Sequence, residues 1–154
     1  MSLKVEDVMV EDVISVQEKA TVKDAAGLMN RHEIGCLIVV KNGKPIGIVT
    51  ETDMVKRVIL RPVDPEKTEV RKIMSEPLVF VNPQMSLEEA SKIMRKQKIK
   101  KLPVIERGRL VGLVTTTDIV RSPELMKMMI KAIKRNIIKE IVRSIEEKLE
   151  LEEQ

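Results

Sequence analysis

The chain has 154 residues, of which 43% are apolar and 34% are charged, and this composition is typical of a folded domain with a buried core. The net charge of +4 is too small to indicate nucleic-acid binding by itself, and the single aromatic residue, Phe80, excludes a surface of stacked rings for single strands. One cysteine, Cys36, and one histidine, His32, exclude an intrachain disulfide and a zinc site built from Cys and His.

The sequence also predicts where the protein works. No stretch approaches the roughly 20 apolar residues that a membrane-spanning helix needs, and the first residues lack the layout of a secretory signal. A cytoplasmic protein without a membrane partner is therefore expected. The excess of Lys, Glu, Ile and Val over Gln, Asn and Cys is compatible with a thermophilic source.

The first predicted unit covers residues 5–59. Its apolar run at 13–16 predicts a strand. Thr21 stands three residues before Asp24, which is the spacing of a capping box at a helix start. Apolar residues then recur at helical intervals as far as His32, so a helix follows the strand.

The second half of this unit predicts a hairpin and a short helix. Strands are expected at 36–40 and 45–50, joined by Asn42-Gly43, a pair typical of a type I′ turn. The short helix is expected to begin near Thr52. The unit is therefore β-α-β-β-α.

The rest of the chain up to residue 121 repeats this unit. Residues 60–69 carry two prolines and several charges without periodicity, and they predict a linker. Beyond it, a shift of 65 positions superposes residues 5–56 on 70–121 without a gap. The second unit, 70–121, has predicted strands at 78–81, 102–105 and 110–115, a helix start at Ser86 and a turn at Arg107-Gly108.

Polar residues and glycines stay in register between the two copies, which indicates an internal duplication. The matched pairs at the end of each unit are Gly47/Gly112, Thr50/Thr115, Thr52/Thr117 and Asp53/Asp118. A unit of about 50 residues buries too little surface alone. We therefore predict an α/β (α+β) fold in which the two copies pack as an intramolecular pair.

Residues 122–154 have no counterpart in the repeat and predict a long amphipathic helix. Ser122 and Pro123 form a typical helix start. Apolar residues then recur mainly every four positions: Leu125, Met129, Ile133, Ile137, Ile141, Ile145 and Leu149, widened by Met128, Ala132, Ile138 and Val142. The helix is basic at its start and acidic at its end. So long an apolar stripe is expected to be buried against a partner surface.

The phrase that ends each unit has the chemistry of a ribose-phosphate site. A carboxylate such as Asp53 can accept hydrogen bonds from both ribose hydroxyls, and a helix N-terminus beside Thr50 favours phosphate. Gly47 and Gly112 would let a ligand or a neighbouring backbone approach closely. The alternative is that the threonine and the aspartate only cap a helix.

The two phrases, GIVTETD at 47–53 and GLVTTTD at 112–118, resemble the motif of the CBS domain, named after cystathionine β-synthase. The resemblance covers residues 5–121. It implies a tandem pair, or Bateman module, that binds AMP, ADP, ATP or S-adenosylmethionine as a regulatory ligand. It also implies a homodimer that acts as a sensor and needs no catalytic residue, metal or further cofactor.

The same resemblance implies roles for individual residues. Asp53 or Asp118 would hold the ribose, with a slight preference for Asp118, and Thr50 or Thr115 would contact ribose or phosphate. Basic residues just before a Leu-Pro-Val strand meet phosphates in the family, and here they match Lys100-Lys101, whereas Gly35 and Cys36 of the first copy depart from that pattern.

An adenine slot is implied near the first strand of each copy. The residues that match it are Val13, Ile14, Val79 and Phe80. Phe80 is the ring available for stacking, although a core position is the alternative for it. His32, Arg31, Arg107 and Arg109 are weaker candidates for phosphate contacts.

The sequence leaves two other functions to consider. The first is an interaction or oligomerisation module that acts through residues 122–154, with an effector protein as its partner and no nucleotide bound. The second is an enzyme, which is disfavoured because no Ser-His-Asp or Cys-His arrangement is evident.

Overall fold

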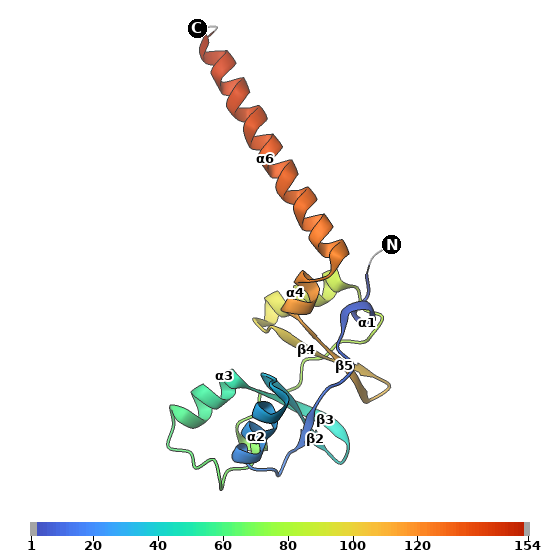
Figure 1. The fold of residues 1–154 in the computed structure, drawn as a ribbon, viewed down its shortest axis with the longest axis vertical. Helices are drawn as coiled ribbons and strands as arrows, with labels where there is room; N and C mark the ends of the chain where they lie inside the picture. The colour runs from blue at the N-terminus through green and yellow to red at the C-terminus, as the bar shows by residue number, and fades with distance from the viewer. Residues whose placement is uncertain (1–2, 153–154) are drawn as a thin grey trace. The chain divides into compact units, whose positions relative to one another are not determined.

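The computed structural model describes residues 3–152, except for the side chains of residues 124, 125, 128 and 129 (Figure 1). The chain forms two compact units, Met1–Thr116 and Thr117–Gln154. The first unit contains α1 (Val5–Val8), β1 (Ser15–Gln17), α2 (Val22–His32), β2 (Cys36–Lys41), β3 (Lys44–Thr50), α3 (Glu51–Met54), the π-helix η1 (Val55–Ile59), the 3₁₀ helix η2 (Val70–Lys72), α4 (Leu87–Gln97), β4 (Lys101–Glu106) and β5 (Arg109–Thr115). The second contains α5 (Thr116–Val120), which begins on the last residue of the first unit, and α6 (Pro123–Glu152).

The long helices of the two repeats begin at the predicted caps. The Thr21 hydroxyl accepts a hydrogen bond from the Asp24 backbone N–H at 3.1 Å. The Ser86 hydroxyl accepts one from the Glu89 N–H, also at 3.1 Å. These bonds satisfy N–H groups that have no partner inside a first helical turn. The predicted starts of α2 and α4 are thus confirmed.

Both hairpins have the predicted turn. Asn42 and Gly43 have φ angles of 50° and 77°, and Arg107 and Gly108 have 50° and 78°. Two consecutive residues with positive φ define a type I′ turn, whose twist matches that of the flanking strands. The turns join β2 to β3 and β4 to β5 as antiparallel pairs.

The first strand differs between the repeats. In the first repeat, β1 pairs in parallel with β2, and the Ile38 N–H donates to the Ile14 carbonyl at 3.2 Å. In the second, the strand predicted at 78–81 is reduced to one parallel bridge between Val81 and Val104. The position equivalent to Ile38 is Pro103, which has no N–H to donate. The prediction of a strand at 78–81 is therefore wrong beyond this bridge.

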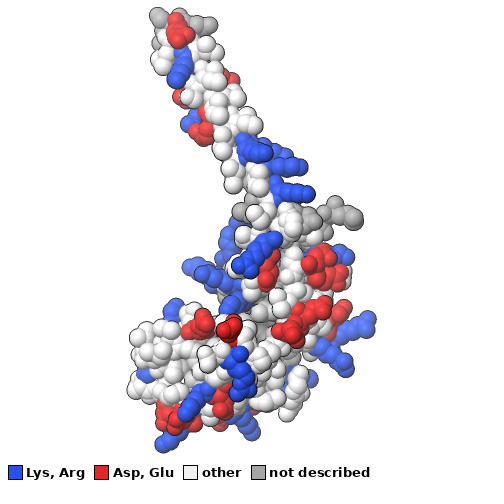
Figure 2. Space-filling model, in the orientation of Figure 1, with Lys and Arg blue, Asp and Glu red and all other residues white. Residues whose placement is uncertain are grey.

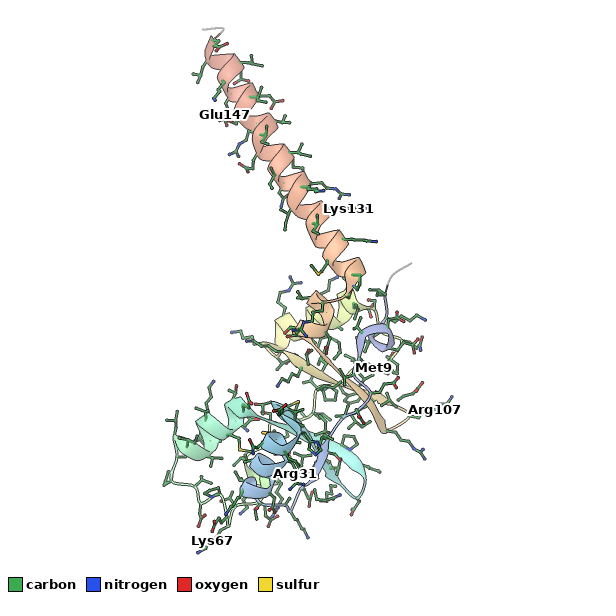
Figure 3. All side chains as sticks on the ribbon, viewed as in Figure 1. Met9, Arg31, Lys67, Arg107, Lys131 and Glu147 are labelled. Carbon is green, nitrogen blue, oxygen red and sulfur yellow. The ribbon has the colours of Figure 1, made fainter. Side chains whose placement is uncertain are left out.

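The segment that leads each repeat packs on the other repeat. We call residues 4–10 and 69–75 the exchanged segments. The Val5 N–H donates to the Met85 carbonyl, and the equivalent Val70 N–H donates to the Ala20 carbonyl, both at 2.8 Å. At the far end of each segment, Val10 pairs with β5 and Ser75 pairs with β3. Met9, the residue before Val10, is labelled in Figure 3.

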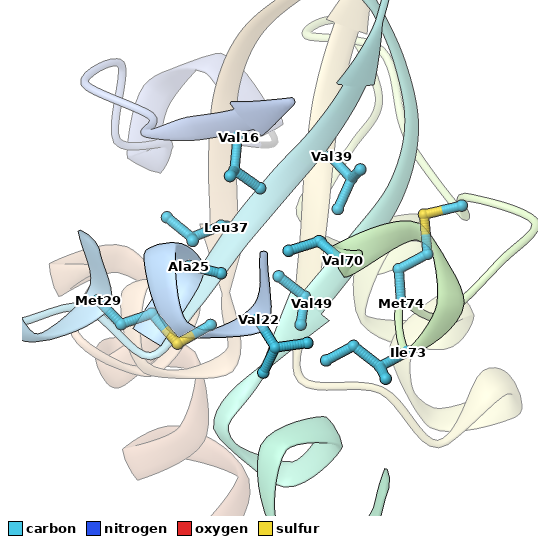
Figure 4. Close-up of a cluster of buried hydrophobic side chains, with 10 residues drawn as sticks. All are labelled: Val16, Val22, Ala25, Met29, Leu37, Val39, Val49, Val70, Ile73 and Met74. Carbon is cyan, nitrogen blue, oxygen red and sulfur yellow. The ribbon is translucent and has the colours of Figure 1, made fainter. Parts of the chain in front are cut away.

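The exchange completes the core of the first repeat. Val70, Ile73 and Met74 are 0%, 3% and 8% exposed and join a cluster formed by the first repeat. The other members of the cluster are Val16, Val22, Ala25, Met29, Leu37, Val39 and Val49 (Figure 4). Because part of this core comes from beyond residue 69, the first repeat cannot complete its fold alone.

The predicted linker, 60–69, holds no helix or strand element but is not detached from the first repeat. The Lys23 N–H donates to the Pro65 carbonyl at 2.9 Å, and the Lys23 ammonium lies 2.8 Å from Glu66. These contacts hold the linker against α2 of the first repeat. The exchanged segment 69–75, which follows the linker, therefore begins beside the first repeat.

In the second unit, α6 is one continuous helix of 30 residues. Predicted stripe residues from Ile133 to Leu149 are about half exposed, whereas Leu125, Met128 and Met129 lie outside the described side chains. No helix among residues 3–152 is long and apolar enough to cross a membrane. The predicted helix is confirmed. Among the described residues, no other part of this chain covers its apolar stripe from Ile133 to Leu149.

Candidate functional site

Residues of both repeats line one cavity of about 410 Å³ in the first unit. The cavity lies where β3 passes into α3, opposite the loop that precedes β4. Its lining residues are Gly35, Ile48, Thr50, Glu51, Thr52, Asp53, Ser75, Lys98, Ile99, Lys100 and Lys101. The predicted Thr50 and Asp53 of one repeat therefore meet the predicted Lys100 and Lys101 of the other.

Thr50 and Asp53 form a reciprocal cap at the start of α3. The Thr50 N–H and hydroxyl donate to Asp53 Oδ2 at 2.9 and 3.2 Å. In return, the Asp53 N–H donates to the Thr50 hydroxyl at 3.2 Å. This is the capping box predicted as the structural alternative. Asp53 nevertheless lines the cavity, so capping and ligand binding are compatible roles.

The other oxygen of Asp53 faces the exchanged segment. Ser75 donates its hydroxyl to Asp53 Oδ1 at 3.1 Å, and Arg57 Nε lies 3.8 Å from the same oxygen. Arg57 also donates to the Ile73 and Met74 carbonyls at 2.9 and 2.7 Å. Asp53 is only 6% exposed, and these donors hold its carboxylate in one orientation.

Sequence reasoning missed Ser75 and Arg57. Arg57 could have been found from its place four residues after Asp53, where side chains of a helix meet. Ser75 carried no such signal, because its contact with Asp53 depends on the exchange of segments. At the equivalent position of the first copy stands Val10, which has no hydroxyl.

The cation side of the cavity consists of Lys98, Lys100 and Lys101. Gly35 provides room for it, because a Cβ atom there would lie 2.9 Å from the Lys101 ammonium nitrogen. The same Cβ would lie 3.4 Å from the carboxyl carbon of Glu51. Three ammonium groups thus share the cavity with two carboxylates, those of Glu51 and Asp53.

Cys36, next to Gly35, is buried and is not a nucleophile at neutral pH. Burial raises the pKa of its thiol above the ordinary value, Lys101 opposes that rise, and Glu51 adds to it. A thiol with a raised pKa stays protonated near pH 7 and is unreactive. The residue is therefore best explained by packing, as predicted.

The other predicted site residues are not among those lining this cavity. Ile14 packs against the first repeat's core cluster, and Val79 is partly buried. Phe80 is 53% exposed, so the core alternative for it is wrong. A Cβ at Gly112 would lie 2.6 Å from the Met9 sulfur, which means that the exchanged segment makes the close approach there.

Thr115 and Asp118 remain predictions. Each has an interaction partner, and Asp118 belongs to the second unit. The weaker phosphate candidates lie elsewhere: Arg31 is exposed on α2, and Arg107 stands in the turn between β4 and β5 (Figure 3).

Comparisons with known proteins agree with this architecture. The family model for the CBS domain matches residues 5–60 and 70–125. The "CBS domain-containing protein YhcV" of Bacillus subtilis is 37% identical over 75% of this chain and 81% of its own length. Two further curated relatives are longer, so that the chain spans only 62% and 63% of them.

Two solved structures share the fold. The hexameric CBS-CP12 protein from bloom-forming cyanobacteria has a TM-score of 0.76 and 33% identity, covering 82% of this chain and 75% of its own. The CBS domain pair of protein MJ0100, solved with 5′-methylthioadenosine and S-adenosyl-L-methionine, has a TM-score of 0.70 and 26% identity, covering 79% of this chain and 95% of its own.

The interlocked repeats and the cavity between them define the class of protein: a CBS-domain pair, which is a regulatory module. The chain belongs to the CBS domain family, with one copy of the domain in each repeat. The predicted family and fold class are thereby confirmed.

Proposed function

We propose that the cavity between the repeats binds a phosphate-bearing adenosine ligand and that the pair acts as a non-catalytic sensor of it. One observation carries the proposal: Thr50 and Asp53 of the first repeat line the same cavity as Lys100 and Lys101 of the second. A ligand that touches both sets links the two repeats. Its binding can therefore change how they are held together, which is what a sensor requires.

The size and chemistry of the cavity support a nucleotide. Its volume of about 410 Å³ falls within the range of about 300–1,000 Å³ that is typical of small-molecule sites. Ile48 and Ile99 offer apolar surface for a base. Asp53 offers a carboxylate for ribose hydroxyls, which would replace or share the hydrogen bond from Ser75.

The charges of the lining favour phosphate over a cationic ligand. Lys98, Lys100 and Lys101 outnumber Glu51 and Asp53, so an anionic group is attracted and the sulfonium of S-adenosylmethionine is not. The similar structure of MJ0100 was solved with 5′-methylthioadenosine and S-adenosyl-L-methionine, which both contain an adenosine group. For this chain we expect AMP, ADP or ATP to bind more tightly than S-adenosylmethionine.

Asp53 is the preferred carboxylate for the ribose, in place of Asp118, which the sequence slightly favoured. Asp53 accepts a hydrogen bond from the Ser75 hydroxyl, and Arg57 fixes the orientation of its carboxylate. Lysines line the same cavity. The Asp118 phrase stays a second candidate site, with the same threonine and aspartate but without a serine at the position of Val10.

Isothermal titration calorimetry with AMP, ADP, ATP and S-adenosylmethionine tests the proposal directly. Asp53→Asn should weaken nucleotide binding by about tenfold or more, because a hydrogen bond to a charged group contributes about 1.5–3 kcal/mol. Asp118→Asn is the matched control and should leave this site intact. Binding lost in Asp118→Asn but kept in Asp53→Asn would move the site to the other copy.

The lysines require a separate pair of variants. Lys100→Ala with Lys101→Ala should lower the affinity for nucleotides and reduce its dependence on salt. Lys41→Ala with Lys44→Ala removes the same charge from the exposed turn end of the β2–β3 hairpin and should change neither. If no ligand at millimolar concentration gives heat with folded protein, the proposal is wrong.

A further inference from the structure

The exposed face of α6 carries a regular apolar row. Ile133, Ile137, Ile141, Ile145 and Leu149 are spaced four residues apart and are 52–56% exposed. Ile138 and Val142 form a shorter parallel row beside them, at 59% and 46% exposed. Five residues at this spacing extend along about 24 Å of helix. An apolar face of this length on an extended helix indicates an interaction surface.

The spacing of the row limits how a partner helix can pack. A row of residues four apart is inclined to the helix axis, and two such rows interdigitate when the helices cross at about −50°. Contact is then centred on one residue and decreases on both sides. Among the side chains of this row that the structure describes, Ile133 to Leu149, the central residue is Ile141, with Ile137 and Ile145 beside it.

The charges of α6 indicate what the partner is. Lys127, Lys131, Lys134 and Arg135 lie in the first half of the helix, whereas Glu146, Glu147, Glu150 and Glu152 lie near its end (Figures 2 and 3). Lys148 is the exception within the acidic end. A parallel copy would place like charges together, whereas an antiparallel copy places the basic half beside the acidic half.

The apolar row and the charges share one centre. Residue 141 lies midway between the basic positions 131–135 and the acidic positions 146–152. About this residue the apolar row is also symmetrical, since Ile137 corresponds to Ile145, and Ile133 to Leu149. We propose that α6 pairs with α6 of a second copy of this chain, antiparallel and crossing at Ile141.

Apolar contact stabilises such a pair, and the charges select its direction. Exposed ion pairs each contribute little, and Arg143 already pairs within its own helix with Glu140 and Glu147 at 3.5 and 3.6 Å. Repulsion between like charges disfavours the parallel arrangement. The pairing is independent of the nucleotide cavity, whose lining residues all lie before residue 102.

The first test uses two variants that add the same charge to α6. Ile141→Glu places a carboxylate at the crossing point and should halve the mass measured by sedimentation equilibrium at 50–100 µM. Asn136→Glu adds the charge on the opposite side of the helix and should leave the mass unchanged. A monomeric wild type, or equal masses for the two variants, would overturn the proposal.

The second test determines direction by disulfide cross-linking in a Cys36→Ala background, where each chain carries one new cysteine. Ile141→Cys should cross-link with itself. Ile137→Cys and Ile145→Cys should each cross-link poorly alone but well when mixed, because residue 137 of one helix lies beside residue 145 of the other. Two copies of residue 137 would be separated by about 12 Å along the helices, beyond the Cα separation of about 7 Å that a disulfide allows.

Parallel pairing would give the reverse pattern, in which Ile137→Cys cross-links efficiently with itself. That result, or the absence of cross-linking at 141, contradicts the proposal. Residues 137, 141 and 145 are exposed on α6 and lie outside the two repeats, so cysteine there should leave the repeats folded. The test therefore remains decisive if Ile141→Glu aggregates. The Cys36→Ala protein without a new cysteine serves as the control and should form no cross-linked dimer.

Discussion

Gly47→Ala tests the exchanged segments, on which both the fold and the candidate site depend. A Cβ atom at this position would lie 2.6 Å from the Met74 sulfur and 3.0 Å from the Ser75 carbonyl oxygen, whereas ordinary contacts begin near 3.4 Å. Met74 is 8% exposed and belongs to the core cluster, so it has little room to move. The segment that carries Met74 and Ser75 must therefore shift away from β3.

The size of the effect follows from overpacking. An added methyl group in a well-packed core costs about 1–3 kcal/mol. For a chain of this size, 1 kcal/mol lowers the melting temperature by about 2–4 °C. Gly47→Ala should therefore lower it by about 2–12 °C. The displacement also carries Ser75 away from Asp53, so nucleotide affinity should fall in the same variant.

Gly27→Ala is the matched control. Gly27 lies within α2, and no atom lies within 4 Å of a Cβ placed there. The same substitution should raise the free energy of unfolding by about 0.5–1 kcal/mol, because alanine favours a helix over glycine. Differential scanning calorimetry measures both variants. If Gly47→Ala is as stable as the wild type, Met74 and Ser75 do not pack against β3 as described.

Further predictions concern residues around the cavity and on the surface. Gly35→Ala should lower nucleotide affinity with little loss of stability, because its Cβ meets the movable end of Lys101 rather than backbone; a large loss of melting temperature would contradict this. Cys36 should resist iodoacetamide at pH 7–8 in the folded protein and react in denaturant, because burial protects the thiol and raises its pKa; rapid reaction of the native protein would refute it. The pKa of Glu66 is lowered by its hydrogen bond with Lys23, so its carbon resonance should titrate below the ordinary range and return toward it in Lys23→Ala. A carboxyl group whose pKa is lower in the folded state stabilises the fold at pH values above its unfolded pKa. This small contribution of Glu66 is lost as the pH falls through its folded-state pKa, and Glu66→Gln should abolish this pH dependence.

The two candidate phrases are alike in sequence but not in surroundings. The exchanged segment that reaches β3 ends in Ser75, and the one that reaches β5 ends in Val10. The hydroxyl of Ser75 binds Asp53, so the first copy has a polar contact that valine cannot supply. Asymmetry of this kind predicts unequal ligand affinities in a duplicated protein. Titration of Asp53→Asn and Asp118→Asn separately measures it.

Local chemistry allowed the sequence to determine most of the secondary structure. The caps at Thr21 and Ser86, the Asn42-Gly43 turn and the apolar periodicities act over a few residues, and therefore each appears in the sequence. The repeat at an interval of 65 residues also predicted that the two units pack against each other as a pair. The prediction of a strand at 78–81 was wrong because the neighbouring strand has Pro103, which lacks an N–H, at the position of Ile38. The order of residues along the chain does not by itself reveal that these two segments are neighbours.

Tertiary structure decided how the cavity is assembled. The sequence indicated Thr50, Asp53, Lys100 and Lys101 as candidates, but it left open which aspartate, Asp53 or Asp118, would lie with the lysines. Nor did it indicate Ser75, whose contact arises because the segment after the linker crosses to the first repeat. Contacts of this kind join residues that are distant along the chain, so they depend on packing that no local pattern encodes.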